Sequence, residues 1–430
     1  MNSVKAITGV PEWLPQYRQV ELAWIKKVSS IYESFGYSPI ETGSFERLET
    51  LQTKGEIDKE IYFVTNKHAE SIDKYGMHYD LTVPFARYVA QNYNALSFPF
   101  KRYQAQKVWR GERPQRGRFR EFYQCDIDVI DNEKLSSYYD IEVLLVGDMA
   151  LSSMEIPAYT IGLSNRKIYE GYLISIGIKN AIPILRVIDK IDKLGIEGVS
   201  KILRDTYNLS RDTITKALKL TEIKSSDLGF VDAFNALDIK SEMSNLGIDE
   251  LKKTFSILLE LDRKNFIVDL SFVRGFDYYT GIIFEGKFNA DPGYGSICSG
   301  GRYENLTEKF INKKLPGVGF SIGLTRIFAK LAEEKMLKME GLNTVDAIVL
   351  RTREDDIKLV LELSDILRGK GLKVEIFHSP GRIDKQFKYA SKKNISWVWL
   401  ESKDKKGVFE VKNMQTGEQK IVSPIEWQPI

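Results

Sequence analysis

The chain has 430 residues, of which 43% are hydrophobic and 28% are charged, and its formal net charge is +3. These proportions are those of a globular protein, and the length predicts two or three domains rather than one. So small a net charge excludes a nucleic-acid binder that relies on a field over its whole surface. Any basic patch is therefore expected to be local.

Rare residue types and missing patterns exclude further classes. The sequence has no apolar run of membrane-spanning length and no signal peptide in its first residues, which predicts a cytoplasmic protein without membrane contact. The two cysteines, Cys125 and Cys298, cannot build a disulfide framework and are expected to be reduced. Three histidines occur, none of them in an HExxH pattern, so no zinc site is expected.

The first 130 residues predict helices and strands in alternation. Apolar residues at helical spacing predict a helix over residues 17–35 that ends at Gly36, followed by a strand from Tyr37 to Phe45 with a turn at Gly43. A second helix is expected within residues 78–92, with Asp80 or Thr82 as its N-cap. Beyond it, an Arg-, Gly- and Pro-rich stretch between two predicted strands indicates a long hairpin, with strands at Phe98–Val108 and Arg120–Ile130.

The later residues predict a helical insert and a second domain. Residues 170–255 are poor in aromatics and helical in period, and the strand pattern resumes at Phe266. A small-residue strand running into a helix is expected over residues 317–326. From Val345 the pattern alternates between strand and helix, which predicts a separate α/β domain with elements at 347–350, 355–370, 373–377, 385–393 and 397–400.

Basic residues concentrate in the predicted hairpin. From Lys101 to Arg120 the chain has eight basic residues and a single acid, Glu112. Arginine outnumbers lysine, as expected where a planar donor fork grips phosphate oxygens in two places. Phe122 and Tyr123 follow and could stack on a base. The alternative is a solvated basic hairpin, but the interleaved Gly, Pro and aromatic residues favour ligand binding.

Three further stretches contain residue types that are suited to ligand binding. Phe272-Val-Arg-Gly-Phe-Asp-Tyr-Tyr279 and Ser299-Gly-Gly-Arg-Tyr303 combine arginine with a tyrosine pair and a predicted Gly-Gly turn. Gly319-Phe-Ser-Ile-Gly323 has the small residues that let backbone approach a ligand, and Arg326 follows on the first turn of a predicted helix. Taken singly, each stretch also has a plain reading: strand packing for the tyrosines and for the small-residue strand, and a simple turn for the glycine pair.

Together these stretches resemble the histidyl-tRNA synthetase family of the class II aminoacyl-tRNA synthetases. The hairpin resembles motif 2, the stretch ending at Arg326 resembles motif 3, and the other two resemble the histidine-specific motifs. The resemblance implies an α+β fold, with an antiparallel sheet flanked by helices in a catalytic domain over residues 1–330. It further implies a helical insertion at about 170–255, a linker at 331–344 and an α/β anticodon-binding domain over 345–430.

The resemblance also implies which residues bind ATP. Arg110 would grip the α-phosphate, Glu112 would contact the adenine side of the nucleotide, and Phe122 would stack under adenine. Arg326 would cover the other face of adenine and the γ-phosphate. Arg274 would lie between the substrate carboxylate and the α-phosphate, where negative charge develops in the transition state. Catalysis is thus implied for Arg110, Arg274 and Arg326.

For the amino acid, the resemblance implies a pocket that pairs both imidazole nitrogens. Tyr279 and Asp128 would each bind one ring nitrogen, which suits a ring with one donor and one acceptor. Asp80 and Thr82 would receive the α-amino group with help from Gln124. The other histidine-binding residues implied are Tyr278, Gly300 and Gly301. At the hairpin tip, the resemblance implies that Arg113 and Gln115 contact the tRNA acceptor end.

The implied reaction joins histidine to tRNA-His through histidyl-adenylate, with Mg²⁺ carried on ATP and a homodimer as the working state. Three positions depart from the family pattern: His78 in place of the usual arginine, Gly43 in place of proline, and Thr325 in place of glutamate. The main alternative is a regulatory paralogue that binds histidine and makes no adenylate. Such proteins usually lack the arginines of motifs 2 and 3 and the C-terminal domain, all of which this chain keeps.

Overall fold

The computed structural model describes residues 4–52, 60–65, 74–272, 279–338, 344–402, 405 and 407–428. By its internal contacts the chain divides into two compact units. The larger comprises residues 1–12 and 23–336, and the smaller comprises residues 13–22 and 337–430. The first long helix, α1 (Pro15–Ser34), matches the helix expected over residues 17–35.

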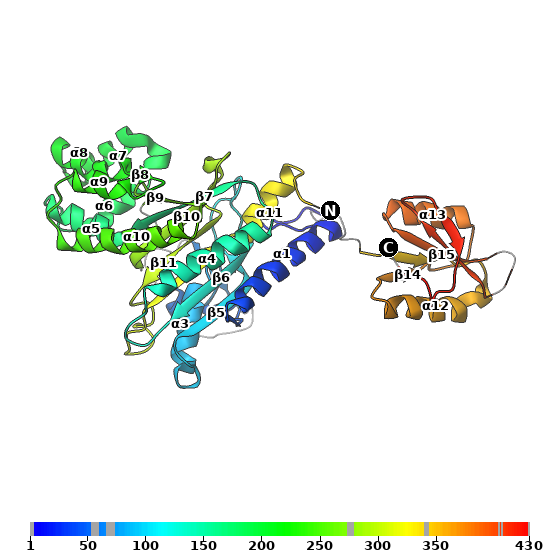
Figure 1. Cartoon of the computed structure of the whole chain (residues 1–430). Coiled ribbons are helices and arrows are strands. Elements are labelled where there is room, and N and C mark those ends of the chain that lie inside the picture. Colours follow the sequence, from blue (N-terminus) through cyan, green and yellow to red (C-terminus); the bar gives the residue numbers. More distant parts are fainter. Residues whose placement is uncertain are drawn as a thin grey trace. The chain divides into compact units, whose positions relative to one another are not determined.

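The larger unit is built on a nine-stranded sheet among the described residues (Figure 1). Two of its strand pairs, β1 with β5 and β7 with β9, are parallel, and the other pairs, including β9 with the short edge strand β8, are antiparallel. The strands in spatial order are β1 (Ser38–Pro39), β5 (Phe100–Trp109), β6 (Glu121–Ile130), β12 (Gly317–Ile322), β11 (Cys298–Tyr303), β10 (Tyr279–Phe288), β7 (Tyr159–Asn165), β9 (Phe266–Asp269) and β8 (Lys224–Ser225). The predicted α+β class with an antiparallel sheet is confirmed.

Helices cover one face of this sheet. Helix α4 (Tyr138–Ser153) packs on β6 and β12, and α11 (Leu324–Glu333) packs on β6. Trp24 of α1 meets Phe328 of α11 edge to face, with ring centroids 5.5 Å apart. Side chains of a strand alternate between its two faces. The polar residues at alternate positions of β6 therefore face away from these helices.

The predicted hairpin is β5 and β6, which pair from Phe100 with Ile130 to Trp109 with Glu121. By contrast, the strand expected from Tyr37 to Phe45, with a turn at Gly43, is mostly absent. Only Ser38–Pro39 pairs with β5, because beyond Ile40 the carbonyl of Thr42 accepts from the Gln106 side chain (2.8 Å) instead of from a ladder N–H. A separate small sheet follows, made of β2 (Phe45–Arg47), β4 (Tyr75–Met77) and β3 (Phe63–Val64), with helices α2 (Leu48–Leu51) and α3 (Thr82–Asn92).

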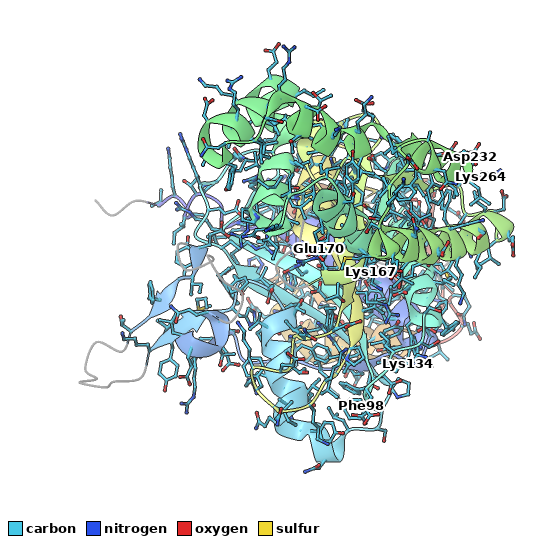
Figure 2. All side chains as sticks on the ribbon, turned by 90° about the vertical axis from the view of Figure 1, so that its left-hand side faces the viewer. Phe98, Lys134, Lys167, Glu170, Asp232 and Lys264 are labelled. Atoms are coloured by element: carbon cyan, nitrogen blue, oxygen red, sulfur yellow. The ribbon has the colours of Figure 1, made fainter. Side chains whose placement is uncertain are left out.

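A helical insertion separates β7 from β9, as the change of composition predicted. Its charged side chains project outward, as Asp232 and Lys264 do (Figure 2). Apolar side chains such as Phe230 and Phe255, which meet edge to face with centroids 6.2 Å apart, form its interior. Its helices are α5 (Arg166–Ser175), α6 (Ala181–Ile188), α7 (Ile191–Tyr207), α8 (Arg211–Lys219), α9 (Gly229–Asn235) and α10 (Glu242–Glu260).

The smaller unit contains a five-stranded sheet with helices α12 (Ile357–Gly369) and α13 (Ile383–Lys392). The strands in spatial order are β14 (Val374–Ile376), β13 (Ala347–Val349), β15 (Trp397–Glu401), β16 (Phe409–Asn413) and β17 (Gln419–Ile421). The first three are parallel, as the strand and helix alternation predicted, and the last two add antiparallel. Trp399 is fully buried at its centre and packs edge to face against Trp427.

Candidate functional site

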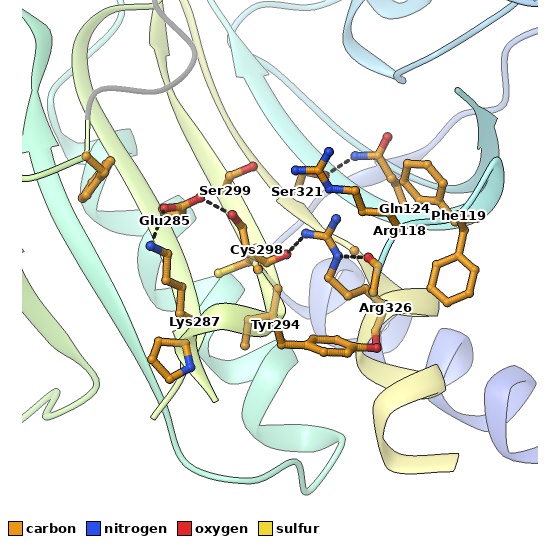
Figure 3. Close-up of a pocket in the computed structure, with 18 of the residues that line it drawn as sticks. Arg118, Phe119, Gln124, Glu285, Lys287, Tyr294, Cys298, Ser299, Ser321 and Arg326 are labelled. Carbon is orange, nitrogen blue, oxygen red and sulfur yellow. Dashed lines mark hydrogen bonds and ion pairs between the residues drawn. The ribbon is translucent and has the colours of Figure 1, made fainter. Parts of the chain in front are cut away.

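A cavity of about 510 Å³ opens on the face of the large sheet that is not covered by α4 and α11. The tip of the β5–β6 hairpin, strands β6, β10, β11 and β12, and the start of α11 all contribute side chains to it (Figure 3). Eight of the sequence-predicted residues line it: Arg110, Glu112, Gln115, Phe122, Gln124, Tyr279, Gly300 and Arg326. Segments more than 150 residues apart in the chain are thus brought to one place.

Arg110 lies at the end of β5, where the hairpin loop begins. Its Nε donates to the carbonyl of Tyr79 (3.0 Å), and its guanidinium carbon lies 5.1 Å from the centroid of the Phe122 ring. A flat aromatic ring beside a cation is the arrangement that a nucleotide needs, since the base can stack while a phosphate is neutralised.

Arg326 is the third residue of α11, as predicted, and reaches into the same cavity. Its Nε and Nη1 donate to the carbonyls of Gly117 and Ser296, both at 2.5 Å. Burial, together with the nearby charges of Arg110 and Arg118, lowers the pKa of its guanidinium to about 10. Three arginines therefore share one positive region, which suits a polyphosphate.

The third member of this group, Arg118, was not singled out by the sequence. Its Nη1 donates to Glu112 (3.0 Å) across the hairpin loop. The tip is a tight turn in which Arg118 N–H donates to the Gln115 carbonyl (2.8 Å), with Gly117 at a φ of 72°. A side chain at Gly117 would lie 2.8 Å from the carbonyl oxygen of Tyr294, so glycine is required. Arg113 and Gln115 are exposed at this tip.

On the amino-acid side, Gln124 and Tyr279 line the cavity, but the glycine pair is not the turn that was expected. Gly300 and Gly301 lie within strand β11. A side chain at Gly301 would lie 2.7 Å from the Ile282 carbonyl oxygen, and one at Gly300 would collide with the Gly319 carbonyl and the Phe284 ring. The glycines let three strands approach closely at the cavity wall.

Four predicted histidine ligands lie outside the cavity lining. Asp128 is buried, forms an ion pair with Arg102 and accepts a hydrogen bond from the Tyr303 hydroxyl (2.9 Å). The N-cap of helix α3 is Leu81, and not Asp80 or Thr82 as predicted: Asp80 precedes it and accepts from the Val83 N–H at Oδ1 (3.0 Å), and Thr82 is the first residue of the helix. Gly301 is the fourth predicted ligand that does not line the cavity. Arg274 and Tyr278 do not belong to the residues that the structure describes.

The structure adds a carboxylate that sequence reasoning missed. Glu285 of β10 is only 6% exposed, lines the cavity, and accepts hydrogen bonds from the Ser296 hydroxyl; Lys287 lies 3.5 Å away. A single acid inside a strand has no recognisable signal in the sequence. Glu285 is linked to Arg326 only in the folded structure, because the Ser296 hydroxyl donates to Glu285 while the Ser296 carbonyl accepts from Arg326. Among the described residues, no group of three or more His, Cys, Asp or Glu side chains could hold a metal ion.

The three departures from the family pattern have definite surroundings. The hydroxyl of Thr325 accepts from the Tyr123 N–H (2.9 Å) and so ties α11 to β6. His78 is fully buried, with Nε2 2.8 Å from the Lys107 carbonyl, and burial lowers its pKa. Gly43 lies between β1 and β2, where an added side chain would lie 3.2 Å from the Phe45 carbonyl oxygen.

An antiparallel sheet that carries an arginine hairpin, a small-residue strand and an arginine at the start of the next helix defines a class II aminoacyl-tRNA synthetase. Comparison with known proteins narrows this class. Residues 9–327 match the family described as histidyl-tRNA synthetase, and residues 346–427 match the family described as anticodon binding domain. The chain therefore belongs to the histidyl-tRNA synthetase family.

Individual relatives agree over the full length. The chain is 45% identical to a histidine–tRNA ligase of Thermobifida fusca over 98% of this chain and 97% of the relative. It is 38% identical to the Micrococcus luteus histidine–tRNA ligase over 100% and 97%. A crystal structure of histidyl-tRNA synthetase from Nostoc sp. PCC 7120 matches with a TM-score of 0.86, at 33% identity, over 98% of this chain and 97% of that one.

Proposed function

We propose that this chain binds ATP and histidine in the cavity described above, forms histidyl-adenylate there, and transfers the histidyl group to the 3′ end of tRNA-His. As a member of its family the chain is a histidine–tRNA ligase, and the regulatory paralogue is not favoured. The observation that supports the proposed site most directly is the meeting of Arg110, Arg118 and Arg326 at one cavity beside Phe122.

In the first step, an oxygen of the histidine carboxylate attacks the α-phosphorus of ATP, and pyrophosphate leaves with the electron pair of the broken P–O bond. The carboxylate is already ionised at neutral pH, so the protein supplies no nucleophile. Arg110 and Arg326 would hold the phosphates in place and neutralise the charge that develops. Arg274 is proposed for the same task on sequence grounds.

In the second step, the terminal ribose hydroxyl of the tRNA attacks the carbonyl carbon of the adenylate, and AMP leaves. Arg113 and Gln115 are proposed to contact the acceptor end, and their exposure at the hairpin tip leaves them accessible. Residues 345–430 are proposed to bind the anticodon, with residues 1–330 as the catalytic domain and 331–344 as the linker. A homodimer and a cytoplasmic location are proposed from the family; none of the described helices is long and apolar enough to cross a membrane.

Class II synthetases use ATP together with Mg²⁺, and the cavity suits such an ion. Glu285 offers a carboxylate next to the Ser296 hydroxyl. Mg²⁺ usually keeps several waters and takes one or two protein carboxylates plus substrate phosphates. Glu285 would hold the ion, and the ion would supply charge to the phosphates. The residues of this chain would still orient the nucleotide and the amino acid.

For histidine, Gln124 and Tyr279 are the proposed contacts that line the cavity, with Asp80 and Thr82 proposed for the α-amino group. The assigned contact between Asp128 and the imidazole stays a prediction. It requires the ring to reach a carboxylate that now pairs with Arg102.

The decisive experiment is ATP–pyrophosphate exchange with each amino acid in turn. Exchange with histidine alone supports the ligase and its proposed site. Histidine binding without exchange would support the regulator, and exchange with another amino acid would refute the specificity. As a site test, Arg326→Ala should reduce exchange by orders of magnitude with the melting temperature nearly unchanged, while the exposed Arg204→Ala should leave exchange as it is.

A further inference from the structure

Two side chains of the cavity wall and a third behind them lie in a row that leads into the sheet. Gln124 of β6 donates from Nε2 to the Ser321 hydroxyl oxygen of β12 (2.6 Å). Ser321 lies directly opposite Asp126 in the β6–β12 pairing, so its side chain lies on the same face of the sheet as the Asp126 carboxyl, and its hydroxyl lowers the pKa of that carboxyl. Gln124 and Ser321 line the cavity, as Figure 3 shows, whereas Asp126 lies behind them and is 3% exposed.

The direction of these bonds is set by the chemistry of the three groups. An ionised carboxylate can only accept, so the Ser321 hydroxyl must donate its one hydrogen to Asp126. The Ser321 oxygen then has lone pairs left and accepts from the Gln124 amide N–H. An amide whose nitrogen is fixed in this way must turn its oxygen to the other side.

Two buried oxygens at this place have no hydrogen-bond partner within the described part of the chain: Gln124 Oε1 and Asp126 Oδ1. A buried acceptor without a donor is costly, and such groups are few in folded proteins. Gln124 lines the cavity, so a cationic donor bound there could satisfy its oxygen. The ammonium group of an amino acid is a donor of this kind.

We propose that Ser321 and Asp126 are positioning residues, which orient the Gln124 amide so that its carbonyl oxygen receives the substrate ammonium group. The inference rests on the proposed function, because it takes the amino acid to bind beside Gln124. It adds two residues to the site, neither of which touches the substrate.

The surroundings of Asp126 determine the conditions for a test. The pKa of the Asp126 carboxyl is raised to about 7, mainly by burial; Arg102 and the Ser321 hydroxyl oppose the rise, and the charges of Asp128 and Asp80 contribute to it. Binding is therefore best measured at pH 8.5, where Asp126 is ionised and can only accept.

The test compares two ligands that differ only in the ammonium group, histidine and 3-(imidazol-4-yl)propionate. Ser321→Ala frees the Gln124 amide to rotate, and it should weaken histidine binding about tenfold, the scale of one hydrogen bond to a charged group. Affinity for imidazolylpropionate should stay within twofold of wild type, because Ser321 and Asp126 act only on the contact with the ammonium group. Calorimetric titration of the full-length chain measures both affinities.

Three further variants separate positioning from general damage. Ser164→Ala is the matched control, since Ser164 is a fully buried serine of β7 in the same sheet but outside the cavity lining, and it should bind both ligands normally. Ser321→Thr keeps the hydroxyl and should retain histidine affinity. Gln124→Met should lose the same tenfold, and adding Ser321→Ala to it should cost nothing more, because coupled residues are not additive.

The positioning role of Ser321 and Asp126 would be overturned if Ser321→Ala bound histidine as tightly as wild type does. An equal loss of affinity for both ligands would overturn it as well. Failure of the proposed function would be seen separately, as wild-type chain that gives no histidine-dependent pyrophosphate exchange.

Discussion

Replacing Arg102 by methionine would test whether this buried cation stabilises the acidic side chains beneath the cavity of the large sheet. Arg102 is fully buried, forms an ion pair with Asp128, and has its guanidinium carbon 4.4 Å from the centroid of the Phe85 ring. Its charge also acts on Asp126, whose pKa it lowers against the opposing effects of burial and of Asp80. Methionine has a similar length and no charge, so the variant removes the cation with little change in packing.

Removing one partner of a buried ion pair costs about 3–5 kcal/mol, because the other charge is left uncompensated. For a unit of some 320 residues this should lower the melting temperature by roughly 5–8 °C at pH 8. The loss should shrink at lower pH. Burial already raises the pKa of the Asp126 carboxyl in the wild type, and without the opposing charge of Arg102 it rises further, so the folded variant binds protons more readily than the wild type and recovers stability as the pH falls.

Scanning calorimetry of the wild type and the variant at pH 8.0 and pH 5.5 would measure this. We expect the difference in melting temperature at pH 5.5 to be at most half of that at pH 8.0. Arg204→Met is the matched control, since Arg204 is 63% exposed in an ion pair with Asp205 and should change the melting temperature by no more than about 1 °C. A deficit that is the same at both pH values would refute the electrostatic reasoning.

Arg118→Ala should raise the KM for ATP in pyrophosphate exchange about tenfold, since it removes one of the arginines that line the cavity; an unchanged KM would argue against a phosphate contact. Gly9→Val should slow tRNA charging several-fold more than exchange, because a side chain there would lie 2.9 Å from Pro114 in the hairpin loop; equal losses in the two assays would contradict this. Gln386→Leu should destabilise the smaller unit by about 2–4 kcal/mol, measured by tryptophan fluorescence in urea, because its buried amide bonds the backbone of Arg351 and Gly381. Exchange activity of that variant should be normal.

The sequence predicted those parts of the fold whose signals are local. Helix α1, the β5–β6 hairpin and the helical insertion follow from periodicity and from turn-forming residues. Strands β16 and β17 were not predicted, since short strands at the antiparallel edge of a sheet have weak patterns. The Gly300–Gly301 pair was misread as a turn, because glycine required for close strand approach and glycine required for a turn look alike in sequence.

The candidate site was predictable to the extent that its residues stand in recognisable stretches. Arg110, Phe122, Gln124 and Arg326 are in such stretches, and the structure brings them to one cavity. Glu285 is not, and its place depends on strand pairing across the sheet. The partnership of Ser321 with Asp126 is equally invisible in the sequence, because it arises only from the register of β6 against β12.

The contacts of Arg326 bear on how nucleotide affinity should respond to salt. Its guanidinium is anchored by the Gly117 and Ser296 carbonyls, which are neutral dipoles and not counterions. An arriving triphosphate does not have to displace an acidic side chain from those two bonds, and the guanidinium keeps its full charge for the ligand. At Arg326, ionic strength should then weaken nucleotide association by screening its charge, and there is no ion pair to Gly117 or Ser296 for salt to loosen.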